Sequence, residues 1–551
     1  MEIISPASLL LASLLPFSWL LFHLLRPSPR HGHGRRIPSP PALPVVGHLQ
    51  LLKKPLHRSL AALAARYGGG RDGAGVLLLR FGSRPVLFVS SPAVADECFT
   101  VHDVALADRP GLASRRLLTD DCPSISTANY GPLWRQLRRL ATVHALCAHR
   151  LAATAAARDA EARAMAAKLW RAGPGAVAVK ATAYEFVVNV IMAMVAGERM
   201  PEEQVLRFKA MTEAGFAAAG AANRQDFMPV LRLLDFGRTA RRLAGLAKAR
   251  HQFGQSLVDE YRRRHPRGAA EETPRTVIGD LLRLQERSPE SHDDVIIRTV
   301  CLSLLQAGTD TSSSTIEWAM ALLLNNPAVL RRATDEIDSI VGTSRLLQES
   351  DLANLPYLQS IIMETLRLYP LAPNHVPHEA SRDCVVAGRT VARGTMVLVD
   401  VYSIQRDPHV WEDSEKFVPE RFMDARDAKR VPQNPTSSSF FRGIKRVPAK
   451  NELHVGFTGI QLASLMDAKA DRHGRWMMPF GMGRRKCPGE GLALRTVGMA
   501  LGAMVQCFKW ERVGEEKVDM SEGSGLTMPM AVPLVAKCRP RLEMESMLKM
   551  L

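Results

Sequence analysis

Hydrophobic and polar positions along the chain predict a mainly helical fold with a small β portion. Residues 141–171 are rich in alanine with charges at helical spacing, and residues 295–324 form a long apolar stretch, so both segments are predicted to be helices. Two β-like runs lie between residues 76 and 90, and strand-like pieces return at 385–400. The sequence has no internal repeat, and residues 51–551 are therefore predicted to form one body.

The N-terminus is predicted to cross a membrane once. Residues 3–25 contain no Asp, Glu, Lys or Arg, and a helix of that length, about 34 Å, can span a bilayer. Four arginines follow between residues 26 and 36, whereas only Glu2 precedes the stretch, which predicts a cytosolic C-terminal side. A cleaved signal peptide is the alternative, but it needs a basic start and a small-residue cleavage site that are not visible. Residues 1–25 are therefore predicted to be an uncleaved signal-anchor.

Two segments differ from the rest of the chain. Residues 26–50 are basic and then rich in proline (IPSPPALPVVGH), which predicts a semi-rigid hinge between anchor and body. Residues 426–468 are polar, basic and irregular, and Met-Asp-Ala stands both just before this segment and at its end. The segment is interpreted either as a surface insertion or as a gene-model error such as a translated intron.

Composition narrows the functional classes. The formal net charge is +17, which favours acidic partners or anionic lipid surfaces. The basic residues are not interleaved with aromatic ones, so nucleic-acid binding is not predicted. Eight irregularly spaced cysteines form neither a disulfide framework nor a zinc motif. They indicate a reducing compartment with free thiols.

The strongest chemical signal is the string FGMGRRKCPG at residues 480–489. Gly481 and Gly483 permit a tight turn and a close backbone approach to a flat group. Cys487 stands just before a predicted helix, with three basic residues at 484–486. A helix N-terminus and positive charge lower the pKa of a thiol, so a thiolate is predicted. Such a thiolate can attack a substrate, bind a metal or do neither, as in a structural cysteine.

A second signal, AGTDTS, lies inside the predicted helix at 295–324. Gly308 in a helix interior costs about 1 kcal/mol relative to alanine, which suggests a close approach by another group. Asp310 and Thr311 form an acid–alcohol pair in apolar surroundings, which suggests a proton relay. A Ser/Thr-rich kink in a core helix is the simpler interpretation of the same residues.

Charged residues at helical spacing form a third group. Glu364 and Arg367 in ETLR stand three residues apart and share a helix face, and Arg421 of PERF is a candidate third member. Trp134 and Arg138 fit the pattern WxxxR on a basic helix. Taken alone, each of these side chains is also compatible with ordinary packing or with a solvated surface.

Together these strings resemble the motifs of the cytochrome P-450 family. They occur in the order WxxxR, AGxDT, ExxR, PERF and FxxGxRxCxG, and the resemblance covers essentially the whole chain apart from 426–468. It implies the cytochrome P-450 fold, preceded by one N-terminal transmembrane helix, with haem b as cofactor. It makes Cys487 the axial ligand of the iron and places Phe480 beside the sulfur. The residues that it implies for contacts with the haem propionates are Trp134, Arg138, His378 and Arg485.

The resemblance also implies roles in the reaction. Gly308 leaves room for dioxygen, and Thr311, aided by Asp310, helps to deliver protons. A further cluster has a structural role and locks the fold around the haem. The members of that cluster are Glu364, Arg367 and Arg421.

The implied reaction is insertion of one oxygen atom of O2 into a lipophilic small molecule. No dinucleotide-binding G-x-G-x-x-G is present, so electrons are expected from a separate NADPH–cytochrome P-450 reductase, with cytochrome b5 as a further candidate partner. The strings YGPLWRQLRR, VPHEASRDC and PFGMGRRKCPGE resemble plant microsomal A-type enzymes that oxidise phenolics, isoflavonoids, indolic compounds and herbicides. The expected location is the endoplasmic reticulum membrane, with the catalytic domain on its cytosolic face.

Three other functions compete with this one. A haem-thiolate isomerase of peroxides needs no O2, but the intact AGTDTS argues against it. An inactive haem protein is the alternative raised by residues 426–468, because this segment lies in the loop that leads to Cys487. The third is a basic membrane protein that binds acidic partners without catalysis.

Overall fold

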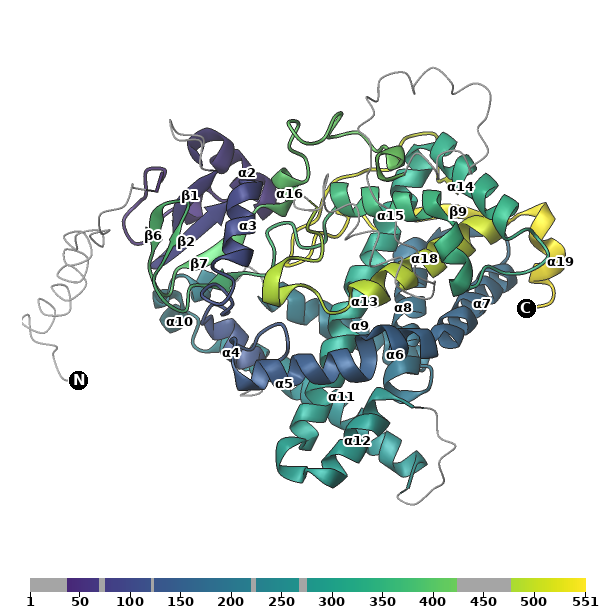
Figure 1. The fold of residues 1–551 in the computed structure, drawn as a ribbon, viewed down its shortest axis with the longest axis horizontal. Helices are drawn as coiled ribbons and strands as arrows, with labels where there is room; N and C mark the ends of the chain where they lie inside the picture. The colour runs from purple at the N-terminus through teal and green to yellow at the C-terminus, as the bar shows by residue number, and fades with distance from the viewer. Residues whose placement is uncertain (1–36, 69–74, 120–122, 220–223, 267–274, 424–476) are drawn as a thin grey trace, which may run out of the picture.

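The computed structural model describes residues 37–551 except 69–74, 120–122, 220–223, 267–274 and 424–476. In this part of the chain helices predominate and the strands form three small sheets (Figure 1), so the predicted mainly helical fold with a small β portion is confirmed. The predicted anchor at 1–25 and the atypical segment at 426–468 both lie outside the described residues.

Helices make up most of the body. The longer ones are α2 Leu56–Leu63, α3 Pro92–Thr100, α5 Pro132–Ala141, α7 Ala155–Ala172, α8 Val179–Ala196, α9 Glu202–Ala219, α11 Arg238–Arg264, α12 Val277–Arg287, α13 Asp294–Asn325, α14 Pro327–Ile340, α15 Pro356–Leu368 and α18 Glu490–Cys507. The shorter ones are α4 Ala113–Thr119, α6 Ala148–Ala153, α10 Val230–Leu234, α16 Val401–Ile404 and α19 Glu545–Leu548. The apolar stretch at 295–324 thus forms one continuous helix, as predicted.

The largest sheet has the order β1-β2-β7-β4 and lies with α2 and α3 at one side of the molecule (Figure 1). Its strands are β1 Val76–Phe81, β2 Arg84–Val89, β7 Met396–Val399 and β4 His378–Glu379. Only β2 and β7 run parallel. The other sheets are β3 Gly175–Ala178 with β9 Val535–Pro540 and β8 Phe508–Arg512, and β5 Cys384–Val386 with β6 Arg389–Val391.

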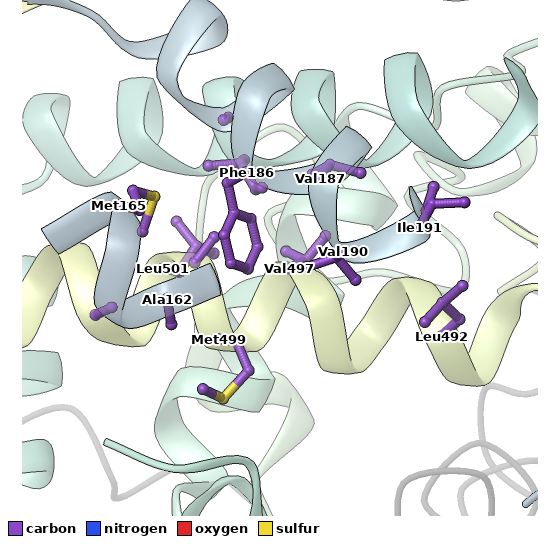
Figure 2. Close-up of a cluster of buried hydrophobic side chains, with 14 of the residues drawn as sticks. Ala162, Met165, Phe186, Val187, Val190, Ile191, Leu492, Val497, Met499 and Leu501 are labelled. Carbon is purple, nitrogen blue, oxygen red and sulfur yellow. The ribbon is translucent and has the colours of Figure 1, made fainter. Parts of the chain in front are cut away.

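The main hydrophobic core surrounds α13. The carboxylate of Asp293 accepts the N–H of Ile296 at 2.8 Å, which caps the N-terminus of this helix. Side chains of α7, α8 and α18 come together around Phe186 (Figure 2), and this cluster continues onto α13. The long central helix is therefore fixed from several sides and can position polar groups within an apolar interior.

Helix α8 is the one helix of the described residues that is long and apolar enough to cross a membrane. Most of its side chains are buried in the core, where it packs against α13. Its hydrophobicity is therefore explained by burial inside the protein.

The segment at 141–171 differs from the single helix that its composition predicts. It divides into a π-helical turn at Thr142–Leu146, then α6 and α7. The break lies at Cys147, whose backbone is extended. Arg150 donates to the carbonyls of His144 at 3.0 Å and of Arg275 at 2.7 Å, so tertiary contacts outweigh the helix propensity of alanine here.

The described part of the predicted hinge lies against the body. The carbonyl of Pro38 accepts the N–H of Leu78 in β1 at 2.8 Å. The His48 ring contacts the Pro40 carbonyl at 2.9 Å and accepts the N–H of Arg80 at 2.8 Å. Residues 37–48 therefore belong to the body, although their prolines predict a linker.

A buried ion cluster connects α15 to the segment that contains PERF. Arg367 donates twice to the Glu364 carboxylate, at 2.7 and 2.9 Å, and both side chains are fully buried. Arg421 donates to the same carboxylate at 3.0 Å, and the N–H of Val418 does so at 2.9 Å. The structure thus brings Glu364, Arg367 and Arg421 together.

Gln405 continues this cluster toward the thiol-bearing loop. Its backbone carbonyl accepts from Arg367 at 2.9 Å, and its side chain donates to the carbonyls of Leu366 and Arg367 at 3.0 Å. Its side-chain oxygen accepts the N–H of Met478 at 2.9 Å. The start of the loop that carries Cys487 is therefore attached to α15 through one buried amide.

The ion cluster predicts a large effect on stability. Replacing Glu364→Gln leaves the buried guanidinium of Arg367 and the half-buried one of Arg421 without their anion, so the free energy of unfolding should fall by about 3–5 kcal/mol. Urea unfolding followed by circular dichroism measures this change. The control is Glu511→Gln, which removes an exposed carboxylate beside Lys509 and Arg539 and should cost less than about 1 kcal/mol. Equal losses for the two variants would contradict a structural role for the buried cluster.

Candidate active site

The loop around Cys487 is shaped by two glycines. Gly481 and Gly483 have φ values of 73° and 63°, which favour glycine. A Cβ on Gly483 would lie 2.5 Å from Oδ1 of Asp103 and 2.8 Å from the carbonyl oxygen of Phe99, so the close approach is made to the end of α3 and the side chain that follows it. The N–H of Cys487 donates to the Phe480 carbonyl at 2.7 Å, and the Phe480 ring packs against the main core. This geometry fixes the backbone that presents the thiol.

The Cys487 side chain is accessible to solvent, although it lies deep enough for burial to raise the pKa of its thiol. The N–H of Gly489 and the charges of Arg138 and Lys486 act in the opposite direction, but they are outweighed. The predicted lowering of this pKa is therefore wrong for the protein alone, because desolvation exceeds the effect of nearby positive charge. A bound metal cation deprotonates a coordinating thiol outright.

Arg485 is held by main-chain carbonyls. Its guanidinium donates to those of Ala107 at 2.7 Å, Ile125 at 3.2 Å and Ala128 at 2.6 Å. It also lies over the ring of Trp134, 4.8 Å from the centroid. Burial lowers its pKa to about 10. The side chain is thus rigid and desolvated, and no acidic residue forms an ion pair with it in the described part of the chain.

Trp134 and Arg138 lie on successive turns of α5. The indole N–H of Trp134 donates to the Ile125 carbonyl at 3.1 Å, so this N–H is already satisfied by the protein. The Arg138 guanidinium lies 5.8 Å from the Trp134 centroid, and burial lowers its pKa. It makes no hydrogen bond or ion pair with the residues that the structure describes, and it lies near enough to Cys487 to affect the thiol.

Arg109 is a further basic residue that the sequence motifs did not reveal. It is buried, and its guanidinium donates to the carbonyls of Ser126 at 3.0 Å, Val376 at 2.7 Å and Pro377 at 2.8 Å. Burial and the nearby Arg485 hold its pKa well below the usual range. The only sequence signal was an arginine in the apolar stretch VALADRPGL, which follows no helical or strand period.

Arg109, Arg138 and Arg485 therefore bring three guanidinium groups into the region of an accessible thiol. In the described part of the chain none of the three has a carboxylate partner, although buried charges are normally paired. A ligand with one metal and two carboxylates would satisfy both the thiol and these cations. The residues present thus fit the haem that the family resemblance implies.

His378 lies in this region, but its ring has no free N–H to donate to a propionate. Its Nδ1 lies 2.7 Å from the carbonyl of Leu106, and a carbonyl can only accept, so Nδ1 carries the proton. Burial and the positive charge of Arg109 hold its pKa well below the usual range. The neutral ring then leaves Nε2 as an acceptor, so the predicted contact with a propionate would require a second proton on this ring.

The close approach expected at Gly308 is made to a neighbouring helix. A Cβ on Gly308 would lie 2.7 Å from Cδ1 of Ile191 in α8, so the glycine lets α8 and α13 pack closely. Helix packing therefore accounts for this residue, and its role toward dioxygen stays a prediction.

Asp310 and Thr311 use different partners. The hydroxyl of Thr311 donates to the Ala307 carbonyl at 2.7 Å. The buried carboxylate of Asp310 lies 3.5 Å from the ammonium of Lys180 and accepts the hydroxyl of Thr527 at 3.3 Å. Within the described residues no hydrogen bond joins the acid to its neighbouring alcohol, so the predicted relay is not assembled by direct contact.

The chain is similar to known proteins over most of its length. A family model of cytochrome P-450 matches residues 37–534. The chain is 41% identical to cytochrome P-450 81Q32 of Catharanthus roseus, over 92% of each chain. It is 39% identical to a (+)-piperitol/(+)-sesamin synthase of Sesamum radiatum, over 93% of this chain and 92% of that one. An isoflavone 3'-hydroxylase of Medicago truncatula is 37% identical, over 91% and 92%.

These relatives are plant enzymes, and they match the chain over nearly its whole length. The chain belongs to the cytochrome P-450 family and is a cytochrome P-450 monooxygenase similar to plant hydroxylases.

Proposed function

We propose that this chain is a haem-thiolate enzyme that inserts one oxygen atom of O2 into a lipophilic plant metabolite or xenobiotic such as a herbicide. The observation that carries the proposal is the accessible Cys487 thiol in a region with three guanidinium groups that have no carboxylate partner among the described residues. Haem b would satisfy both requirements, because it has one iron and two propionates.

Each residue then has a specific role. Cys487 would bind the iron, with Phe480 beside the sulfur, and Arg109, Arg138 and Arg485 would bind the propionates. The haem supplies the oxidising chemistry, and thiolate donation favours cleavage of the O–O bond. Asp310 and Thr311 would manage protons on α13. The protein contributes position, polarity and exclusion of water.

The names of the relatives support a proposal for the substrate class. Their names describe isoflavones as compounds hydroxylated and piperitol and sesamin as compounds made, and all of these compounds carry aromatic rings. We therefore propose a phenolic, isoflavonoid or similar aromatic compound as substrate.

Electrons would come from NADPH–cytochrome P-450 reductase, with cytochrome b5 as a second donor. The net charge of +17 suits an acidic docking partner. Residues 1–25 would anchor the enzyme in the endoplasmic reticulum membrane, with the body on the cytosolic face. An uncleaved chain in the microsomal fraction, with the body open to protease from the cytosolic side, would support this topology.

A second candidate is an inactive haem protein. One observation favours it: residues 426–468 stand between Arg421, which bonds to Glu364, and Met478, which bonds to Gln405. Both contacts are made in the full chain, so this candidate rests on the position of the segment in the sequence.

Arg138 offers a test of the proposed haem site. Arg138→Leu removes a guanidinium that makes no hydrogen bond with the described protein, so the fold should survive. Loss of a hydrogen bond to a charged propionate should speed haem release about tenfold or more. Transfer of haem to apomyoglobin measures this rate. Arg139→Leu, at an exposed position of α5, is the control, and equal rates for both variants would contradict the assignment.

The catalytic proposal is tested with the reductase, NADPH and a panel of isoflavones and lignans. The full chain and a version lacking residues 426–468 are compared by mass spectrometry of products. We expect products heavier by one oxygen atom, with the label recovered from 18O2. Products from the shortened chain alone would assign the inactivity to the insertion. Haem-loaded protein of both kinds without any such product would contradict this substrate class.

A further inference from the structure

A hairpin near the C-terminus reaches the buried acid of α13. The N–H of Ala531 donates to the Ser521 carbonyl, and the N–H of Gly523 donates to the Pro529 carbonyl, both at 2.8 Å. These bonds close residues 521–531 into a hairpin. Thr527 lies in its turn and donates its hydroxyl to Oδ2 of Asp310 at 3.3 Å.

The turn of this hairpin is fixed by bonds that do not involve Thr527. The indole N–H of Trp318 on α13 donates to the Met528 carbonyl at 2.9 Å. The N–H of Met528 donates to the Leu371 carbonyl at 3.0 Å. The backbone beside Thr527 is therefore held on two sides, and its hydroxyl is not needed to keep the turn in place.

The base of the hairpin is fixed as well. The buried carboxylate of Glu522 lies 2.7 Å from Nε2 of His57 and 2.6 Å from Nε of Arg58, both in α2. Burial alone would raise the pKa of Glu522, but the hydrogen bonds from His57 and Arg58 lower it to about 2. The hairpin is thus a rigid arm between α2 and α13.

The two oxygens of the Asp310 carboxylate contact residues of two different elements, α8 and the hairpin. Oδ1 lies 3.5 Å from the ammonium of Lys180, near the start of α8, and Oδ2 accepts from Thr527. Meanwhile Thr311 bonds to its own helix. The carboxylate is therefore restrained in one orientation, and the hairpin supplies one of its two restraints.

We propose that Thr527 is a positioning residue for Asp310: the hydroxyl, carried on a rigid hairpin, holds the carboxylate in the orientation from which it serves proton transfer. The proposal rests on the proposed function, because proton supply matters only in an enzyme that reduces O2. Without this restraint the carboxylate turns more freely, and proton delivery should become less directed.

The ratio of peroxide to NADPH reports this defect with or without an organic substrate. One NADPH and one proton reduce O2 to H2O2, whereas two NADPH and two protons reduce it to two molecules of water. Monooxygenation consumes one NADPH and one proton for each O2 and releases one water. A carboxylate that delivers protons less selectively should therefore change the amount of H2O2 formed for each NADPH oxidised.

The experiment compares three variants of the haem-loaded full chain with the reductase. Thr527→Val removes the hydroxyl and keeps the shape, while Thr527→Ser keeps the hydroxyl. Ser524→Ala removes an exposed hydroxyl from the same hairpin and is the matched control. We expect Thr527→Val to raise the amount of H2O2 formed for each NADPH oxidised by about threefold. This change corresponds to only part of the free energy that a hydrogen bond to a charged group contributes. Thr527→Ser and Ser524→Ala should stay near the wild-type ratio.

A second measurement tests the contact itself without turnover. Thermal midpoints are compared for Thr527→Val, Asp310→Ala and the double variant. Because the two side chains touch, their effects should be non-additive, whereas distant sites add. Additive shifts, or a peroxide ratio unchanged in Thr527→Val, would overturn the proposal. A wild-type chain that binds no haem or oxidises no NADPH would instead refute the proposed function, and the thermal cycle would still decide the contact.

Discussion

The buried carboxylate of Glu364 holds together the segments that place the thiol. It neutralises Arg367 on its own helix and Arg421 across the PERF turn, and all three would be costly to bury alone. Arg367 also donates to three main-chain carbonyls between residues 405 and 416, so an irregular stretch of chain becomes attached to a rigid helix. Gln405 extends the same network to the start of the thiol-bearing loop.

The region of Cys487 contrasts with that cluster. Both regions contain buried or half-buried arginines, but those near the thiol donate to neutral carbonyls or, like Arg138, only face an aromatic ring. In the first region the protein supplies the anion itself, and in the second the cations have no carboxylate partner among the described residues. This difference separates a structural ion cluster from a site prepared for an anionic ligand, and it supports the haem assignment independently of sequence resemblance.

Much of this fold could be predicted from periodicity, because α13 and the β1–β2 pair carry strong patterns. The Glu364–Arg367 pair could be predicted from its helical spacing, and the partnership with Arg421 from the family resemblance. Three features could not be predicted from the sequence. The break at Cys147 comes from contacts made by Arg150, the raised pKa of Cys487 comes from burial, and Arg109 lies in a loop without a period. Each of these depends on tertiary surroundings that no local pattern encodes.

The central claim is that Cys487 binds haem iron as a thiolate, and the reduced carbon-monoxide difference spectrum tests it most directly. The account predicts that the full chain, with bound haem, shows a Soret band at the wavelength for which the family is named. Cys487→Ser should lose that band even where haem is retained, because an alcohol does not provide the same donation to the iron. Haem-loaded wild-type chain without the band, or a band that survives the substitution, would contradict the account.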